Sequence, residues 1–526
     1  MARRLDANDN ASQLAPAIST SATHLMNSYT FFSGGFAGQG AKVFLEDGGR
    51  AYTYDDLDRE SARYAAFFQG LGLVAGDRVA AQIDKSADAV FLYLGVLRAG
   101  LAYLPLNTDY QRGELGYFLG DAEPRAVICR RSAAAVFGEL LKDARDAKLF
   151  TLDASGEGTL REAVAAVPAA AVAGFRTVDR ADDDLALIIY TSGTTGRSKG
   201  AMVTHGNICS NAAVLKDFWR ITASDVLVHA LPLFHVHGLF VALHPLLLAG
   251  ATILMQRKFE PRAVLAEFSR ATMLMGVPTF YVRLLGEAGL TREACGHMRL
   301  FISGSAPLLT ETFDAFRERS GHTILERYGM SEAGMITSNP YEGERRRGTV
   351  GPALPGNSVR VVDPEGKPLP PMQPGDVQIK GPNVFKGYWR MPEKTREEFT
   401  ADGWFRTGDI GQWDEKGYLA IVGRAKDLII SGGFNVYPKE VEMILDNISG
   451  VVESAVVGVP HPDFGEAVTA VLVVRAGTTL SEADVIARVK AELAGYKVPK
   501  RVHFVEDLPR NAMGKVQKAA LRKQYG

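Results

Sequence analysis

Short apolar runs that alternate with helix-like segments dominate the first half of the chain and restrict the folds it can adopt. The runs have the length and composition of buried strands, and they lie at residues 78–83, 126–129, 186–189, 226–231 and 252–255. Segments with apolar residues near helical spacing, such as 52–72 and 87–97, precede or separate them. Strands that alternate with helices build parallel sheets with helices on their faces. We therefore predict an α/β fold whose mostly parallel sheets are covered by helices.

The sequence changes character near residue 350 and again near residue 424. Turns rich in glycine and proline, with short alternating strands at 358–362 and 376–380, predict a small antiparallel β unit. Beyond residue 427 we expect a helix at 438–445, strands at 453–459 and 468–474, a helix at 482–493, a strand at 502–505 and then a polar tail. A chain of 526 residues is too long for one core. We predict a disordered extension at 1–25, a large N-terminal domain at 26–423, a hinge at 424–427 and a small, mobile α+β domain at 428–526.

Composition and charge exclude several classes of protein. A net charge of −1 gives no basic field that would attract nucleic acid or an anionic membrane. The longest apolar run, 239–255, is interrupted by histidine, proline and glycine, so we expect buried core and no membrane span. The three cysteines are too far apart in the sequence for a metal-ligand motif or a disulfide framework, which favours a reducing cytosol. Asp6 and Asp9 weaken a transit-peptide interpretation of the N-terminus.

The stretch Tyr190–Gly200 is the most informative part of the sequence. It follows an apolar run and consists mainly of glycine, serine and threonine, with Lys199 near its end. Glycines let a main chain approach phosphate oxygens, successive N–H groups can form an anion-binding nest, and a lysine adds a compact positive charge. A Walker A loop would require the spacing G-x-x-x-x-G-K-[ST], which this stretch lacks. We therefore predict a phosphate-binding loop of another kind; the alternative is a flexible surface turn.

Four further segments contain more polar residues and glycine than a core requires. They are 303–307, 326–332, 407–409 and 510–515, and the first three follow strand-like runs. In open α/β sheets, ligands bind at the carboxyl ends of strands. We expect these segments to converge with Tyr190–Gly200 on one crevice.

These segments, in this order, resemble the ordered motif series of adenylate-forming enzymes, a family that includes acyl-CoA synthetases, peptide-synthetase adenylation domains and beetle luciferase. The matching motifs are Tyr190–Gly200, Tyr328-Gly-Met-Ser-Glu332, Thr407-Gly-Asp409, Gly423-Arg-Ala-Lys-Asp427 and Pro509-Arg-Asn-Ala-Met-Gly-Lys515. The resemblance extends from about residue 30 to the C-terminus. Within the family, Leu231–Gly238, Gly276–Arg283 and Phe301–Pro307 are most similar to stretches of malonyl-CoA synthetases.

The resemblance implies a two-step reaction. A carboxylate first attacks the α-phosphorus of ATP to give acyl-AMP and pyrophosphate, and the thiol of coenzyme A then displaces AMP to give a thioester. The first step brings two anions together, so its transition state needs N–H donors and positive charge around the phosphates. The resemblance also implies Mg²⁺ as a cofactor that bridges phosphate oxygens, with Glu332 as its carboxylate ligand.

The resemblance assigns individual residues to ATP and to catalysis. The phosphates would be held by Thr191, Ser192, Gly193, Thr194, Thr195, Gly196, Lys199 and Ser331. Further ATP contacts would come from Ser303, Ala306, Glu326, Arg327, Tyr328, Asp409, Arg424 and Lys515, with Tyr328 stacking on adenine and Asp409 accepting two ribose hydroxyls. Catalytic roles would fall to Lys515, His235, Thr194 and Glu332. From the residues alone, Glu332 as a helix cap, Tyr328 as a core residue and Asp409 as a turn residue remain alternatives.

Two segments of the C-terminal part have implied roles that depend on domain rotation. Lys515 would reach the α-phosphate and carboxylate oxygens during adenylation; outside its motif, it would be interpreted as a solvated charge. Lys426 occupies the hinge position, and rotation there would withdraw Lys515 and bring Ser431, Gly432 and Gly433 toward a pantetheine channel. We also expect a lysine acetyltransferase to regulate the enzyme at Lys515, because acetylation removes the charge.

The identity of the acid depends on one charged side chain. A dicarboxylate such as malonate brings a second carboxylate into the protein, where it is costly unless it is paired. Arg283 is the candidate partner because arginine pairs bidentately with carboxylates; Arg299 is a rival, and a surface helix arginine is the alternative. Ser305 offers a hydroxyl to the same carboxylate. His235 would position the reacting carboxylate, which is already ionised and needs no general base.

We predict a cytoplasmic enzyme that ligates malonate, and also methylmalonate, to coenzyme A at the expense of ATP. The alternatives are a CoA ligase for another short acid, an adenylation enzyme that loads a carrier protein, and a non-catalytic nucleotide-binding regulator. The sequence has no carrier domain with an Asp-Ser-Leu serine motif, and a regulator would have no need of Lys515. We expect neither a nucleic acid nor a membrane as a partner.

Overall fold

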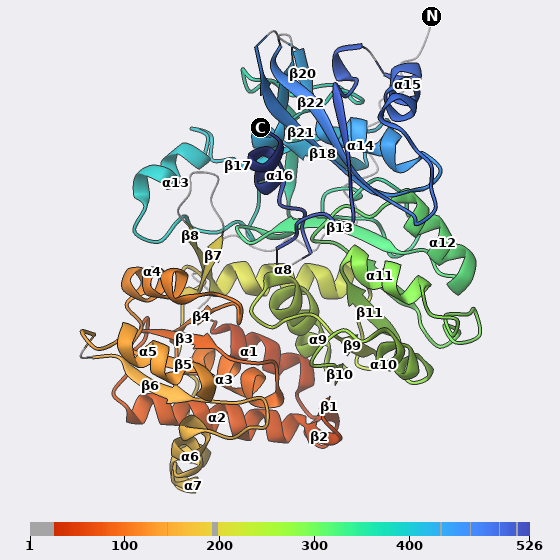
Figure 1. Ribbon diagram of the computed structural model, residues 1–526. Coiled ribbons are helices and arrows are strands. Elements are labelled where there is room, and N and C mark those ends of the chain that lie inside the picture. The colour runs from red at the N-terminus through yellow and green to blue at the C-terminus, as the bar shows by residue number, and fades with distance from the viewer. Residues whose placement is uncertain are drawn as a thin grey trace, which may run out of the picture.

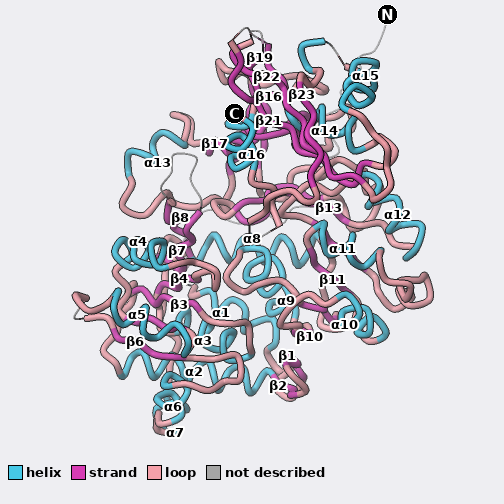
Figure 2. The backbone as a smooth tube through the Cα atoms, in the orientation of Figure 1, coloured by secondary structure: helices cyan, strands magenta, loops and turns pink. Residues whose placement is uncertain are grey.

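The molecule is built from four sheets with helices packed around them (Figures 1 and 2). This computed structural model describes residues 26–144, 146–191, 198–431, 434–462, 464–493, 495–511 and 514–526. Two large, mostly parallel sheets form the lower part of the molecule in Figure 1, and the strands of two smaller sheets lie above them. The predicted α/β fold is therefore confirmed. Within the described ranges, no helix combines the length and the apolar character needed to cross a bilayer.

The first large sheet has the strand order β6-β5-β3-β4-β7-β8. Its strands are β3 (Arg78–Gln82), β4 (Ala102–Pro105), β5 (Ala126–Cys129), β6 (Lys148–Thr151), β7 (Leu185–Thr191) and β8 (Lys199–Thr204). Neighbours run parallel except β7 and β8, which are antiparallel. The helices of this part are α2 (Tyr54–Gly70), α3 (Ala87–Arg98), α4 (Arg112–Ala122), α5 (Ala134–Leu140), α6 (Thr159–Ala165) and α7 (Ala169–Gly174). Because β7 and β8 pair in an antiparallel way, Lys199 at the start of β8 lies opposite Thr191 at the end of β7.

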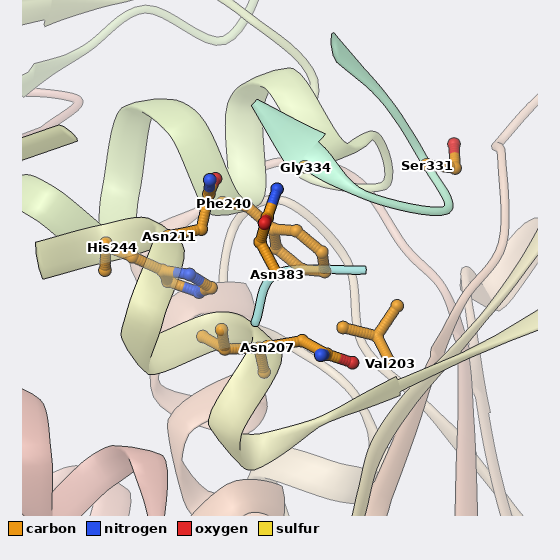
Figure 3. A pocket seen from close by; sticks show the side chains of 10 residues that line it. Val203, Asn207, Asn211, Phe240, His244, Ser331, Gly334 and Asn383 are labelled. Atoms are coloured by element: carbon orange, nitrogen blue, oxygen red, sulfur yellow. The ribbon is translucent and has the colours of Figure 1, made fainter. Parts of the chain in front are cut away.

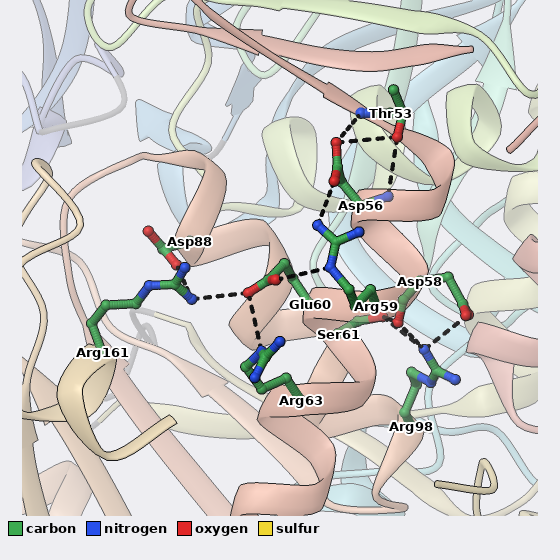
Figure 4. A network of polar contacts seen from close by, with 10 residues as sticks. All are labelled: Thr53, Asp56, Asp58, Arg59, Glu60, Ser61, Arg63, Asp88, Arg98 and Arg161. Atoms are coloured by element: carbon green, nitrogen blue, oxygen red, sulfur yellow. Dashed lines mark hydrogen bonds and ion pairs between the residues drawn. The ribbon is translucent and has the colours of Figure 1, made fainter. Parts of the chain in front are cut away.

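A polar network fixes α2 (Figure 4). A capping box begins this helix, because Thr53 accepts a bond from the Asp56 N–H while Asp56 accepts one from the Thr53 N–H. Further along, the buried carboxylate of Glu60 lies 3.0 Å from Arg161 and 3.6 Å from Arg63. A buried charge destabilises a fold unless it is paired. The arginines therefore have a structural role here.

The second large sheet has the order β14-β13-β12-β11-β9-β10-β1-β2, with antiparallel strands at its two edges. Its strands are β1 (Val43–Asp47), β2 (Arg50–Thr53), β9 (Val226–His229), β10 (Thr252–Met255), β11 (Met273–Gly276), β12 (Leu300–Ser303), β13 (Leu325–Met330) and β14 (Gly334–Ser338). The helices are α1 (Ser28–Ser33), α8 (His205–Phe218), α9 (His244–Ala249), α10 (Pro261–Ala266), α11 (Pro278–Leu285) and α12 (Thr310–Ser320). Residues His237–Leu243, just before α9, form a buried π-helix. Such turns are rare and often occur at functional sites.

The two smaller sheets follow in sequence. The predicted antiparallel unit is the sheet β15-β16-β17-β18, formed by Ser358–Val362, Gly375–Lys380, Phe405–Trp413 and Leu419–Arg424, with α13 (Pro392–Glu398) between its second and third strands. A 3-10 turn at Ala425–Asp427 coincides with the predicted hinge. The last sheet contains β19 (Ile429–Ser431), β20 (Phe434–Val436), β21 (Val451–His461), β22 (Gly465–Val474) and β23 (Arg501–Val505). Its helices are α14 (Pro438–Asp446), α15 (Glu482–Glu492) and α16 (Lys518–Tyr525).

The helix α16 corrects a sequence prediction. The residues after 505, expected as a polar tail, end in this helix. Leu521 is 1% exposed and packs with Ala455 and Val457 of β21, and Tyr525 stacks on His503 with ring centroids 4.0 Å apart. Leu521 and Tyr525 lie at i and i+4, so they share the face of α16 that packs on the sheet. The charged residues around them hid this pattern in the sequence.

The three cysteines form no disulfide, as the sequence predicted. Cys129 and Cys295 are buried, and Cys209 is partly buried. Burial raises the pKa of Cys129 to about 12 and that of Cys295 to about 11, and it also raises the pKa of Cys209. Because thiolates are the reactive form, all three thiols are poor nucleophiles at neutral pH.

Candidate active site

Glu332 lies where the first large sheet meets the second. Its Oε1 accepts hydrogen bonds from Thr191 Oγ1 at 3.3 Å and from the Tyr388 hydroxyl at 3.2 Å. Burial raises the pKa of this carboxyl, which these donors and the charge of Lys199 oppose. A buried carboxylate that lacks a full counter-charge suits a hard cation. The described residues contain no cluster of three or more His, Cys, Asp or Glu side chains that could hold a metal, so a Mg²⁺ ion here would depend on Glu332, phosphate oxygens and waters.

Asp409 and Arg424 face each other on adjacent strands. They are register partners on β17 and β18, and Arg424 Nε lies 2.8 Å from Asp409 Oδ1. The Tyr328 hydroxyl donates to Asp409 Oδ2 at 2.5 Å. Each carboxylate oxygen has two acceptor sites, so Asp409 retains capacity for hydroxyl donors while its partners fix its orientation. The predicted nucleotide residues Tyr328, Asp409 and Arg424 are thus joined directly.

Several buried polar atoms at the carboxyl end of β12, in the first half of β13 and at the start of the π-helix have no hydrogen-bond partner among the described residues. They are Ser303 Oγ, Glu326 Oε2, Arg327 Nε and Nη2, and His237 Nε2. Burial raises the pKa of Glu326 to about 8 and lowers that of Arg327 to about 9. Since more than about 90% of buried polar groups in proteins are satisfied, such a concentration marks a place for a polar ligand. Gly304 lets the Arg327 guanidinium approach the backbone here, since a Cβ would lie 2.4 Å from Arg327 Nη1 and would displace it.

His235 is fixed as a hydrogen-bond donor. Its Nδ1 accepts the backbone N–H of His237 at 3.2 Å. Burial, followed by the charges of Lys515 and Arg327, lowers the pKa of His235 to about 3. A neutral imidazole whose Nδ1 is an acceptor carries its proton on Nε2. His235 can therefore donate one hydrogen bond from Nε2, which agrees with a positioning role and not with proton abstraction.

The predicted acid-binding residues lie on two elements. Ser305 has φ +72°, a conformation that favours glycine, and its hydroxyl lies 3.2 Å from His237 Nδ1. Arg283 is exposed near the end of α11, with its guanidinium 5.2 Å from the Phe259 ring centroid. The described residues provide it with no carboxylate within ion-pair distance. The rival Arg299, in contrast, is bound to Asp225 at 2.6 Å and 2.8 Å.

Lys515 reaches this site from the C-terminal part of the chain. Burial, followed by the positive charge of Arg424, lowers its pKa to about 8, while Asp409 and Glu332 oppose the shift. The side chain still has substantial solvent contact, which limits the effect of burial. The adjacent Gly514 approaches Thr279 of α11. Lys515 therefore lies among the predicted ATP residues and beside the helix that carries Arg283.

The remaining predicted residues are placed as follows. Ala306 and Ser331 are partly exposed. Burial lowers the pKa of Lys426 in the 3-10 turn, and Ser431 is buried on β19 opposite Gly465 of β22. Ser192, Gly193, Thr194, Thr195, Gly196, Gly432 and Gly433 lie outside the described residues.

The turn that carries Glu332 is held by asparagines that sequence reasoning missed (Figure 3). Asn383 Nδ2 donates to Ala333 O at 2.6 Å and to Met335 O at 3.1 Å. Asn211 Oδ1 accepts the N–H of Met335 at 3.1 Å, and its amide donates back to Met335 O at 3.0 Å. Both asparagines line a small cavity of about 10 Å³ under the turn. Since neither belongs to a motif, the sequence offered no signal for them.

Sequence reasoning also missed Lys85 and His229, which support the segment that carries His235 and His237. Lys85 is buried, and its ammonium lies 2.7 Å from His229 Nδ1, 2.6 Å from His229 O and 2.8 Å from Leu231 O. His229 Nε2 in turn lies 2.9 Å from Gly238 O, at the start of the π-helix. The Gly238 carbonyl can only accept, so a neutral His229 donates from Nε2–H and its Nδ1 accepts from Lys85. This relay connects β9 to the segment that carries His235 and His237.

Comparisons with known proteins agree with this site. Residues 35–389 match the family model for AMP-binding enzymes, and residues 440–515 match that for the AMP-binding enzyme C-terminal domain. A feruloyl-CoA synthase of an Amycolatopsis species is 35% identical over 92% of this chain and 96% of its own length. A malonate–CoA ligase of Arabidopsis thaliana is 33% identical over 92% of this chain and 86% of its own length.

Solved structures give the same result. The crystal structure of ATP-bound MatB from Rhodopseudomonas palustris matches with a TM-score of 0.91 and 53% identity, covering 95% of this chain and 99% of that chain. Apo MatB matches with a TM-score of 0.83. The chain therefore belongs to the AMP-binding family of adenylate-forming enzymes, and it is an AMP-forming acid–CoA ligase.

Proposed function

We propose that this enzyme ligates malonate, and with it methylmalonate, to coenzyme A in the cytoplasm. The observation that carries the proposal is the position of Arg283. It lies one helical turn after Thr279, which Gly514 of the Lys515 loop approaches, so the two α11 residues share a face. An arginine beside the acid site without a protein carboxylate is available for the distal carboxylate of a dicarboxylic acid. The likeness to MatB and to the Arabidopsis malonate–CoA ligase supports this choice.

The geometry supports the following division of roles. His235 donates Nε2–H to the reacting carboxylate, Lys515 offsets the negative charge that develops between carboxylate and α-phosphate, and Asp409 with Arg424 orients the ribose. Mg²⁺, with Glu332 as its protein ligand, would neutralise charge on the phosphates. Rotation at Lys426 then withdraws Lys515 before the thiol of coenzyme A attacks. The hinge, the domain boundaries and the thiol channel at Ser431 are part of this proposal.

A pyrophosphate-release assay with five acids tests the proposal. Wild-type enzyme should prefer malonate and methylmalonate over succinate, acetate and propionate. In Arg283→Ala, kcat/KM for malonate should fall by about 10- to 100-fold, because a charge-assisted contact with the distal carboxylate is lost, while the rate with propionate changes little. Arg262→Ala is the matched control, since Arg262 is an exposed arginine on the neighbouring α10 that pairs with Glu287.

Two results would overturn the assignment. Equal losses with malonate and propionate would mean that Arg283 does not bind the distal carboxylate. A wild-type preference for acetate, propionate or another monocarboxylic acid would replace malonate with the first alternative, a CoA ligase for a different short acid.

A further inference from the structure

Lys199, a predicted phosphate ligand, already has an anionic partner within the chain. Its ammonium lies 3.2 Å from Glu398 Oε1, and 4.2 Å from the centroid of the Tyr388 ring. The side chains of Lys199 and Glu398 are 11% and 22% exposed, so water screens this pair less than a surface pair. Tyr388 also donates to Glu332. The ion pair is therefore part of the same site.

Backbone hydrogen bonds hold the segment that carries Glu398 in place beside Lys199. The segment before α13 pairs with β8, through Trp389 N to Gly200 O at 2.7 Å and Met202 N to Gly387 O at 2.9 Å. Glu398 ends α13. Its position beside Lys199 follows from this pairing.

Glu398 has a second cationic partner. Lys394, one turn earlier on α13, lies 3.2 Å from the same Oε1 atom and 2.9 Å from Glu397. One carboxylate oxygen is thus shared by two ammonium groups. If Lys199 leaves, Glu398 keeps Lys394 as a counter-ion and is not left unpaired.

We propose that Glu398 is an exchangeable counter-ion for Lys199, displaced by the phosphates of ATP and restored when pyrophosphate leaves. This inference rests on the proposed adenylation reaction but not on the identity of the acid. An anionic carboxylate and a polyphosphate compete for the same ammonium, so Glu398 weakens ATP and pyrophosphate binding and accelerates pyrophosphate release. Lys394 favours the exchange, because it stabilises Glu398 in the displaced state.

Substitutions of Glu398 and of Lys394 should change phosphate binding in opposite directions. Glu398→Gln removes the competitor, so the Kd for Mg²⁺-ATP and the inhibition constant for pyrophosphate should each fall about 3- to 10-fold, the range of a partly buried ion pair. Lys394→Met removes the alternative partner, so Glu398 should hold Lys199 more tightly and both constants should rise. Glu393→Gln is the control, because Glu393 is an exposed glutamate of the same helix and has no ion pair among the described residues.

Calorimetric titration with Mg²⁺-ATP in the absence of any acid, and pyrophosphate product inhibition, measure these constants on the full chain. We expect both constants to fall in Glu398→Gln, to rise in Lys394→Met and to stay unchanged in Glu393→Gln. Weaker ATP binding by Glu398→Gln, or the same direction of change in both variants, would overturn the inference. If Glu398→Gln does not fold, an unchanged or lowered Kd in Lys394→Met overturns it alone. The titration does not depend on turnover, so an inactive acid panel would refute the proposed function without affecting this result.

Discussion

Two neighbouring side chains in the site have pKa values below their usual ones. His235 is neutral at any physiological pH because its pKa is about 3. Lys515, with a pKa of about 8, is charged at neutral pH but loses its charge within a range that an assay can reach. The pH dependence of adenylation should therefore report Lys515 and not histidine.

The first residue-scale prediction concerns this pH profile. In the proposed mechanism the ammonium form of Lys515 stabilises the transition state, so kcat/KM for ATP should be constant near pH 7 and fall about tenfold per pH unit above about 8. Pyrophosphate release between pH 6 and 10 measures this. Lys515→Arg, which stays charged, should be slower but show no decline in that range. A wild-type profile that stays flat to pH 10 would contradict the assignment.

Removal of Lys515 should separate the two half-reactions. Lys515→Ala should reduce adenylation by more than about 100-fold, the scale of a lost charge-stabilising contact, yet leave thioester formation from supplied malonyl-AMP within about twofold of wild type. Equal loss in both assays would show that Lys515 does not act in adenylation alone. Acetylation of Lys515 would remove the same charge and stays a prediction.

At the scale of elements, the π-helix His237–Leu243 depends on the relay through His229 and Lys85. Removing Lys85 takes its donor away from His229 Nδ1 and from the buried Leu231 carbonyl, whereas His229 O keeps the Gln256 N–H at 2.9 Å. Lys85→Met should therefore raise KM for the acid about tenfold or more, while KM for ATP changes less than about twofold.

The matched control is His205→Gln. His205 is also a buried histidine, with its Nδ1 bonded to Ser28, and it is not connected to the π-helix by these contacts. Both variants should lose thermal stability, but Lys85→Met alone should change the acid KM and the ¹⁵N shifts that report the His229 tautomer. Parallel changes in both KM values would indicate a general loss of structure and refute the relay.

The sequence predicted elements better than it predicted contacts between them. The strand at 126–129 and the strand at 252–255 are found at the same residues, because apolar runs bounded by turns depend on local composition. The π-helix was not predicted, since its hydrogen-bond register leaves no distinct pattern in side-chain spacing. Lys85 and Glu398 were missed because their partners are 144 and 199 residues away, and neither lies in a motif.

The candidate site shows the same limit, because its residues could be named from the sequence but their contacts could not all be predicted. The resemblance named Asp409, Arg424 and Tyr328, and the structure joins them directly. It gave no indication that Arg299 would be bound to Asp225, which removes it as a rival of Arg283. The geometry of the phosphate loop, from Ser192 to Gly196, stays a prediction.

At the scale of the whole molecule, the C-terminal part of the chain lies against the predicted ATP residues, with Lys515 among them. The TM-score is 0.91 to ATP-bound MatB and 0.83 to apo MatB. In the proposed reaction, thiol transfer uses a second placement, reached by rotation at the 3-10 turn Ala425–Asp427. A change at this predicted hinge should therefore affect the second half-reaction more than the first.

Lys426→Pro tests this rotation. Proline fixes φ at about −65°, so the variant should keep ATP–pyrophosphate exchange within about threefold of wild type but lose tenfold or more of thioester formation. Lys426→Ala removes the charge and leaves φ free, so it should retain both activities. If the proline variant forms thioester at the wild-type rate, rotation at residue 426 is not needed.

The poor reactivity of the native thiols has a practical consequence for observing this rotation. With all three cysteine pKa values raised, maleimide dyes should react selectively with cysteines introduced at exposed positions. Val74, 67% exposed, and Val452, 44% exposed, provide one such position before the hinge and one after it. A donor–acceptor pair at these two sites would record the two placements as distinct transfer efficiencies in single molecules, without removal of any native cysteine.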